Sequence, residues 1–380
     1  MTATAKTHGL DGTLVEPDWA PLESAEVRTL LDHYGLHAAV QIESVSPRPF
    51  SAASVVRVGA ERVFVKRHPH AVRDAAGLAE EHAFLAHLVQ HGVVVPRVLA
   101  TREGMTAVEQ GEWTYEAHAT PAGVDIYEEA LSWTPYRSVA HARAAGEALA
   151  RLHEAAAGYA APARKVQPLV ASFTIFAAKD AATAMERYLS TRPALNSDRQ
   201  TRIDCEQALE LLAPLHAELR PLLHELPPLW THNDLHGSNL LWTDSSDRAR
   251  IAAVIDFGLA DRTNAVHDLA HAIERSIVEW LQLGDGAVRV PVHYDQLFAL
   301  LEGYESVRTL SEAEAHALAP MAALCHAEFA LTETDYFLGA LHSPERGRVA
   351  TEGYLVGHAQ WWRGPGQTTL EALRRWAEAR

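Results

Sequence analysis

The first third of the chain alternates apolar and polar residues with the two-residue period of β-strands. Gly59 and Ala60 form a tight turn between two of the strand candidates, which favours an antiparallel meander. A helical period appears at residues 22–34 and again at residues 74–90, where it ends before Gly92. Strands are predicted at residues 40–45, 55–58, 62–66, 105–109 and 113–118. We therefore expect a small antiparallel sheet of about five strands with one helix inserted.

After residue 120 strand signals become rare, and long helices rich in alanine and leucine dominate. Pro214, Pro221 and Pro320 fall inside predicted helices, where a kink or a break is expected. Helices are predicted at residues 141–157, 172–189, 199–226, 266–283, 294–309, 311–341 and 344–362. The change of pattern predicts an α+β protein with two lobes. Its expected parts are a flexible leader at residues 1–21, a sheet-rich N-lobe at 22–120 and a helical C-lobe at 121–380.

Composition narrows the class of protein further. The hydrophobic share is 48% and the charged share is 22%, which are ordinary values for a globular chain. The formal charge of −16 argues against a nucleic-acid partner and is compatible with a cationic substrate. Cys205 and Cys325 fit no disulfide or zinc pattern. Without a signal peptide or an apolar run of about 20 residues, we expect a cytoplasmic protein that does not enter a membrane. The sequence does not indicate an oligomeric state.

The strongest chemical motif is His-x-Asp followed, after four residues, by Asn, at residues 232–239. Two short apolar runs follow, and the second ends in Asp256-Phe257-Gly258. A strand, a tight loop and a returning strand would bring Asp234, Asn239 and Asp256 close together. Such a group suits phosphoryl transfer, with Asp234 accepting the proton of a hydroxyl while Asn239 and Asp256 hold Mg²⁺.

Residues of the N-lobe complete this hypothesis. Lys66 on the third strand is expected to bind the phosphates of ATP or another nucleoside triphosphate, held in place by Glu81 on the following helix. The loop at residues 47–54 would cover these phosphates, although it contains no glycine. The backbone between Glu116 and His118 is expected to form the hinge that binds the adenine edge.

Histidines and carboxylates of the C-lobe suggest further roles. His232 is expected to be structural, hydrogen-bonding the backbone around Asp256, whereas His236 faces either the substrate or the metal. Three carboxylates lie on or near one predicted helix, and three aromatic residues accompany them; the carboxylates are Glu328, Glu333 and Asp335, and the aromatic residues are Tyr336, Trp361 and Trp362. Carboxylates with aromatic rings would suit an amine-bearing alcohol as substrate.

These features together resemble the aminoglycoside phosphotransferase/choline kinase superfamily, small-molecule kinases with a protein-kinase-like fold. The matching segments, spread over roughly residues 40 to 275, are Lys66, Glu81 with Phe84-Leu85, Val95-Pro96, residues 148–153, residues 232–239, residues 255–258 and residues 268–270. The resemblance implies a bilobal fold, Asp234 as base, Asn239 and Asp256 as magnesium ligands, and Lys66 with Glu81 as the triphosphate anchor. The glycine-free loop departs from the protein-kinase pattern.

Two alternatives remain beside a kinase of small hydroxyl compounds. Only nine residues separate Gly258 from Asp268, which is too short for a protein-kinase activation segment. A protein kinase of the bacterial stress-response type nevertheless shares the His-x-Asp-x-His pattern around His236. The glycine-free loop would also suit a nucleotide-binding pseudokinase that serves as an interaction module.

Overall fold

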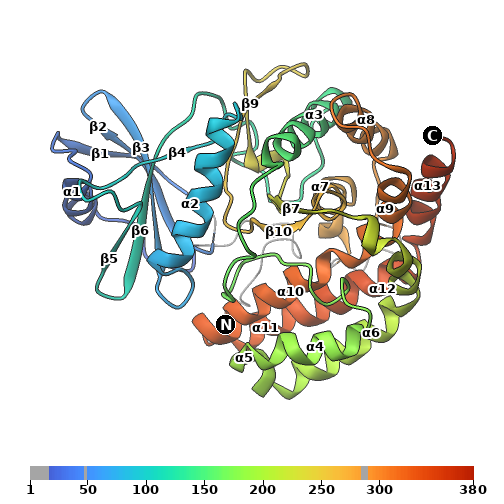
Figure 1. Cartoon of the computed structure of the whole chain (residues 1–380). Coiled ribbons are helices and arrows are strands. Elements are labelled where there is room, and N and C mark those ends of the chain that lie inside the picture. Colours follow the sequence, from blue (N-terminus) through green and yellow to red (C-terminus); the bar gives the residue numbers. More distant parts are fainter. Residues whose placement is uncertain (1–16, 47–48, 284–289) are drawn as a thin grey trace.

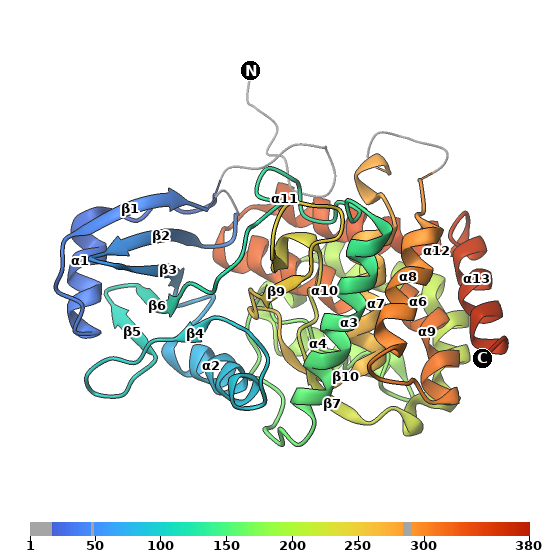
Figure 2. The same cartoon turned by 90° about the horizontal axis from the view of Figure 1, so that it is seen from above.

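The computed structural model describes residues 17–46, 49–283 and 290–380. A small twisted sheet with two helices lies beside a larger helical part, and the chain passes from one to the other after residue 119 (Figures 1 and 2). This confirms the expected α+β fold class. Among the described residues, no helix combines the length and apolar character needed to cross a membrane. Most of the leader predicted at residues 1–21 lies outside the described residues.

The N-terminal sheet is antiparallel and has six strands in the order β1-β2-β3-β6-β4, with β5 also paired to β6. Its core is made of apolar residues such as Val56, Val65 and Ala117, which pack with helix α1. Helix α2 begins after Asp74, whose carboxylate caps the amide of Gly77 at 2.7 Å. The strands are β1 (Val40–Val45), β2 (Ala52–Val58), β3 (Glu61–Pro69), β4 (Arg97–Val98), β5 (Ala107–Gln110) and β6 (Trp113–Ala119), and the helices are α1 (Ser24–His33) and α2 (Ala75–Gln90).

The second part is mostly helical and has one continuous apolar core, which also takes in the inner face of α2 through residues such as Phe84 and Leu88. Its α-helices are α3 (Val139–Ala156), α4 (Ala181–Ser190), α5 (Pro193–Ser197), α6 (Arg199–Leu219), α7 (Ala265–Ile277), α8 (Tyr294–Glu305), α9 (Glu312–Leu324), α10 (His326–Asp335), α11 (Pro344–Arg348), α12 (His358–Arg363) and α13 (Gln367–Glu378). Short 3₁₀ turns follow α6 and α7, at Arg220–Glu225 and Trp280–Gln282, and π-helical turns at Tyr336–Ala340 and Val349–Gly357 join α10, α11 and α12.

Two small antiparallel ladders interrupt these helices and carry the motif residues. Strand β7 (Pro228–Thr231) pairs with β10 (Asp261–Asn264), and β8 (Leu240–Trp242) pairs with β9 (Ile251–Val254). The predicted strand-loop-strand arrangement therefore forms. The segment after Thr231 and the segment after Val254 leave their ladders on the side that faces the N-terminal sheet (Figure 1).

Three helix predictions were inaccurate. The one at residues 266–283 ends early, because α7 stops at Ile277 and Val278 is extended. Residues 172–180 do not join α4, because the amides of Thr174 and Ile175 bond to the buried carboxylate of Glu328 instead of to helix carbonyls. The predicted helix at residues 311–341 breaks into α9 and α10 beyond Pro320, which lies inside α9, and ends in a π-helical turn. The terminal helix α13 was not predicted.

Candidate active site

A pocket lies where the sheet faces the helical part. One section of it has a cavity volume of about 120 Å³ and is lined by Lys66, Asp234, His236, Asn239 and Asp256 together with apolar residues. An adjoining section of about 490 Å³ extends along β6 and the segment after it, and shares Lys66, Asn239 and Asp256. The residues that the motif spacing grouped are therefore close in space.

The loop after β7 is held by a buried carboxylate from α7. Asp268 accepts the amide of His232 at 2.8 Å and that of Asn233 at 2.7 Å, and also contacts His153 at 3.0 Å. His232 accepts the amide of Asp234 through Nδ1, so its Nε2 carries the proton that it donates to the carbonyl of Ile255 at 2.9 Å. His232 thus has the expected structural role, tying the Asp234 loop to the segment before Asp256.

Asp234 is surrounded by donors. Arg275 Nε lies 2.9 Å from Oδ1, Asn239 Nδ2 lies 3.0 Å from Oδ2, and His236 Nε2 lies 3.6 Å from Oδ2. Burial alone would raise the pKa of Asp234, but His236 and then Arg275 outweigh it and hold the pKa well below its usual range. The carboxylate is therefore ionised and fixed in orientation. Arg275, at the end of α7, was not identified from the sequence.

Asn239 and Asp256 fit the requirements of a hard cation. Asn239 uses its Nδ2 to donate to Asp234, both to the carbonyl at 2.8 Å and to the carboxylate, which leaves its oxygen side available as a ligand. The side chain of Asp256 is 48% exposed and its Oδ1 lies 3.3 Å from Lys66 Nζ. An amide oxygen next to an accessible carboxylate is the donor set that Mg²⁺ or Ca²⁺ prefers.

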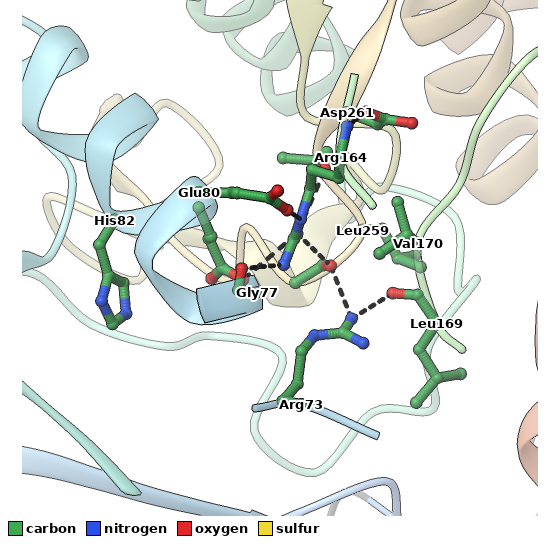
Figure 3. Close-up of polar contacts among 12 residues, drawn as sticks. Arg73, Gly77, Glu80, His82, Arg164, Leu169, Val170, Leu259 and Asp261 are labelled. Carbon is green, nitrogen blue, oxygen red and sulfur yellow. Dashed lines mark hydrogen bonds and ion pairs between the residues drawn. The ribbon is translucent and has the colours of Figure 1, made fainter. Parts of the chain in front are cut away.

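Lys66 pairs with a different residue from the one that was predicted. Lys66 makes its ion pair with Asp256, whereas Glu81 pairs with Arg164 at 3.4 Å. Arg164 also donates to the carbonyls of Gly258 at 3.0 Å and Gly77 at 2.9 Å, and so joins α2 to the loop after Asp256 (Figure 3). Among the described residues Lys66 and Glu81 form no ion pair, and Glu81 pairs instead with this arginine, which the sequence analysis did not single out.

A second buried arginine strengthens this junction. Arg73, just before α2, donates to the carbonyls of Leu169 and Gly258, the latter at 2.9 Å (Figure 3). Burial and then the charge of Arg164 lower the pKa of Arg73 to about 9. Two guanidinium groups therefore hold the Asp256-Phe257-Gly258 segment against the N-terminal part.

The backbone between Glu116 and His118 does not form the free hinge that was predicted. These residues lie inside β6, which is hydrogen-bonded to β3 on one side and to β4 and β5 on the other, so their backbone groups belong to the sheet. Their side chains do line the pocket, and Glu116 contacts His68, His82 and His118 at 2.7–2.9 Å. In this cluster the ligand atoms of His82, Glu116 and His118 lie within 4.8 Å of one another.

The loop predicted to cover the phosphates is only partly described. Residues 47 and 48 lie outside the described residues, and Ala52 already belongs to β2. Pro49, Phe50 and Ser51 line the smaller pocket section. The loop thus borders the pocket, and its contacts with phosphate stay a prediction.

The structure assigns the predicted substrate carboxylates to other partners. Glu328 accepts the amide of Ile175 at 2.6 Å and the hydroxyl of Thr174 at 3.0 Å. Asp335 lies 3.9 Å from Arg192, and burial raises its pKa to about 6. Neither residue lines the pocket, so both hold C-lobe segments together. His236 does line it, and because its Nδ1 accepts the amide of Ser238 at 3.3 Å, its Nε2 proton faces Asp234.

Backbone strain marks residues that the sequence analysis missed. Non-glycine residues with positive φ in the described chain are Trp133, Leu169, Asn233, Asp256 and His342. Three of them, Trp133, Leu169 and Asp256, line the smaller pocket section, and Asn233 precedes Asp234. Such conformations persist where the surrounding structure enforces them and gather at functional sites. No sequence motif points to Trp133 or Leu169.

The chain is similar to several curated relatives in sequence and to several solved structures in fold. A homoserine kinase from Rhodospirillum rubrum is 29% identical over 248 residues, covering 65% of this chain and 66% of that enzyme, slightly under two thirds of its length. A microcompartment-associated aminopropanol kinase has a similar fold, with a TM-score of 0.58 at 19% identity over 90% of this chain and 97% of the other. An amicoumacin kinase solved with AMP-PNP and Ca²⁺ reaches a TM-score of 0.54 at 13% identity, over 86% and 94% of the two chains.

A family model matches the part of the chain that contains the site residues. It covers residues 47–310 and therefore takes in Lys66, the Asp234 loop, Asp256 and Arg275. The match spans more than half of the chain and includes both sides of the pocket. The chain belongs to the phosphotransferase enzyme family, whose model is abbreviated APH.

Proposed function

We propose that this protein transfers the γ-phosphate of ATP to a hydroxyl of a small polar molecule, with Asp234 as the base. The proposal rests on one observation: the same pocket is lined by Asp234, Asn239, Asp256 and Lys66. A carboxylate that is ionised and fixed by Arg275 is suited to orient a hydroxyl and to accept its proton late in the transfer.

Each residue has a separate task in this scheme. Lys66 lies in the pocket beside Asp256, and a bound triphosphate would offer it phosphate oxygens in place of that carboxylate. Asn239 and Asp256 would hold a divalent cation, most simply Mg²⁺, which when bound offsets negative charge on the phosphates. His236 keeps a proton directed at Asp234 and limits the positions that carboxylate can take.

The acceptor is expected to be small. The pocket section next to Asp234 has a volume of about 120 Å³, and a 150 Å³ cavity holds a molecule of roughly benzene size. The relatives named homoserine kinase support a short amino alcohol or hydroxy amino acid more than a multi-ring aminoglycoside. We therefore propose an alcohol of this size as the substrate class.

Phosphate transfer from radiolabelled ATP tests the proposal. Purified protein with Mg²⁺ is offered L-homoserine, 1-amino-2-propanol, ethanolamine and neutral diols, and labelled products are separated. We expect one or more small alcohols to be phosphorylated. Asp234→Asn should lower the rate by about 10²–10⁴ while ATP binding by calorimetry persists.

The same assay separates the alternatives. Binding of ATP without transfer to any alcohol would favour the interaction-module interpretation. A labelled protein band in a lysate would instead favour a protein kinase. Full activity of Asp234→Asn would contradict the assignment of the base.

A further inference from the structure

Three histidine side chains converge on one carboxylate where the N-terminal sheet borders the pocket. Glu116 Oε1 lies 2.9 Å from His68 Nε2. The other oxygen, Oε2, lies 2.9 Å from His82 Nε2 and 2.7 Å from His118 Nε2. The members of this histidine cluster come from β3, α2 and β6, and in Figure 3 His82 lies on α2 apart from the arginine junction. The cluster therefore joins the helix to two neighbouring strands.

The carboxylate of the cluster is buried and has no lysine or arginine as a partner. Glu116 is 3% exposed, and the three histidines are buried as well. Among the residues that the structure describes, only these histidines pair with Glu116, because Lys66 pairs with Asp256 and Arg164 with Glu81. A buried carboxylate in this setting favours the binding of a cation.

Two members of the cluster have the protonation state that a metal ligand needs. Burial by itself would raise the pKa of Glu116, but the charge of His118 and the hydrogen bonds from the histidines hold that pKa well below its usual range. Burial lowers the pKa of His68, so its imidazole is neutral. Metal ions bind ionised carboxylates and neutral imidazoles, so neither group has to lose a proton first.

The histidine rings are free to present Nε2 to an ion. Nδ1 of His82 and Nδ1 of His118 are buried and have no hydrogen-bond partner in the described part of the chain. A partner at Nδ1 would fix which nitrogen carries the proton. Without one, the proton of a neutral ring can move from Nε2 to Nδ1, which leaves the Nε2 lone pair available. The two rings lie at 78° to each other, so they approach the carboxylate from different directions.

The ligand atoms lie close enough together for a single ion. Those of His82, Glu116 and His118 are all within 4.8 Å of one another, and His68 contacts the second oxygen of the same carboxylate. Bonds of about 2.0–2.2 Å from zinc to nitrogen and oxygen place tetrahedral ligands roughly 3.3 Å apart. Each present hydrogen bond would therefore lengthen by about 0.5 Å as the ion takes the place of the shared protons.

We propose that this cluster of three histidines and Glu116 binds a divalent transition-metal ion such as Zn²⁺. Imidazole ligands favour such ions over Mg²⁺, so the site is distinct from the expected magnesium ligands. Glu116 lines both sections of the pocket, which gives the ion a path to the cluster. When bound, the ion holds α2 against β6. The site does not depend on the proposed kinase function.

Calorimetric titration with ZnCl₂ tests this site. Untagged protein is stripped with EDTA, dialysed and titrated in excess Mg²⁺, which competes for oxygen ligands but not for imidazoles. We expect one Zn²⁺ per chain with a Kd of about 1 μM or less. The midpoint of thermal unfolding should rise by a few degrees, because the ion binds the folded chain. His82→Gln and Glu116→Gln should each weaken Zn²⁺ binding by at least about 100-fold.

An exposed histidine next to the same helix provides a matched control. His91 directly follows α2, and its ring centroid lies 4.0 Å from that of His87, so this surface pair also offers imidazoles to zinc. His91→Gln should leave the Kd of Zn²⁺ unchanged. Loss of binding in His91→Gln with normal binding in His82→Gln would overturn the assignment, and so would a wild type that binds no Zn²⁺ in excess Mg²⁺.

A spectroscopic measurement does not require the variants to fold. X-ray absorption at the zinc edge of the one-to-one wild-type complex should show about four nitrogen or oxygen ligands at 2.0–2.2 Å, with the scattering pattern of three imidazoles. Two or three imidazoles on the ion support the site, and one or none overturns it.

Discussion

The two sides of the pocket differ in whether their ionisable groups have partners. On the side of the sheet every ionisable group has a partner: Lys66 pairs with Asp256, Glu81 with Arg164, and Glu116 with three histidines. On the side of the helices Glu333 has none. The side chain of Asp256 is 48% exposed, whereas Glu333 is 1% exposed, so the acid without a partner is also the more deeply buried of the two.

The difference matters for how each side could respond to a charged ligand. A triphosphate with its cation is large and highly charged, and under the proposed function it would exchange partners with Lys66 and Asp256, which are already paired. A buried acid without a partner instead carries an energetic penalty. The following changes test this contrast.

The largest loss of stability is expected when the guanidinium group of Arg275, which pairs with Asp234, is removed. Arg275→Met leaves Asp234 and Glu274 buried without their shared guanidinium group and should lower the free energy of unfolding by about 3–5 kcal/mol in urea titrations. Arg143→Met removes an exposed pair with Glu302 and should cost less than about 1 kcal/mol. Similar small losses in both variants would mean that the helical side does not rely on Arg275.

The next largest effect is expected from lowering the pH, which should reduce the stability of the helical side. Burial lowers the pKa of His267 to about 3 and that of His326 to about 4, so both stay neutral in the folded protein while the unfolded chain takes up protons near pH 6.5. Stability is therefore lost as the pH falls below about 6.5, by about 3 kcal/mol for the two together at pH 5.5. Unfolding in urea at pH 7.5 and 5.5 measures this. His326→Gln should show a smaller loss; an unchanged loss would assign the effect to other groups.

The smallest effects contrast two acids on one helix. Glu328→Leu leaves the amides of Thr174 and Ile175 without their acceptor and should destabilise the fold by about 2 kcal/mol. Glu333→Leu removes an unpaired buried carboxyl group and should stabilise it by about 1 kcal/mol. Thermal unfolding of the two variants compares the signs directly. Destabilisation by Glu333→Leu equal to that by Glu328→Leu would show that Glu333 supports the fold.

Local patterns in the sequence were enough to predict that Asp234, Asn239 and Asp256 lie close together. The His-x-Asp motif follows β7, and Asn239 and Asp256 lie at the open end of the ladder of β8 with β9, so the short spacing along the chain nearly fixes their spacing in space. Strands β1 and β6 and helix α2 were predicted to within one residue of their ends, because their apolar periods are strong and bounded by glycine or by a cap.

Contacts between distant segments could not be predicted this way. The ion pair of Glu81 with Arg164 joins residues 83 positions apart, and nothing in the sequence marks Arg164 as closer than Lys66. The carboxylates of Glu328 and Glu333 are chemically alike and five positions apart, yet only packing decides that the first bonds the Thr174 segment while Oε2 of the second has no partner.

The sequence by itself therefore determined the fold class and the group of residues suited to phosphoryl transfer, because both depend on short-range periodicity and spacing. Only the tertiary structure decided which arginines hold Asp234 and Glu81, where the apolar wall of Trp133 and Leu169 lies, and which acid stays unpaired. Those contacts depend on how loops and helices that are far apart in the chain pack together. Such packing produces no periodic pattern in the sequence.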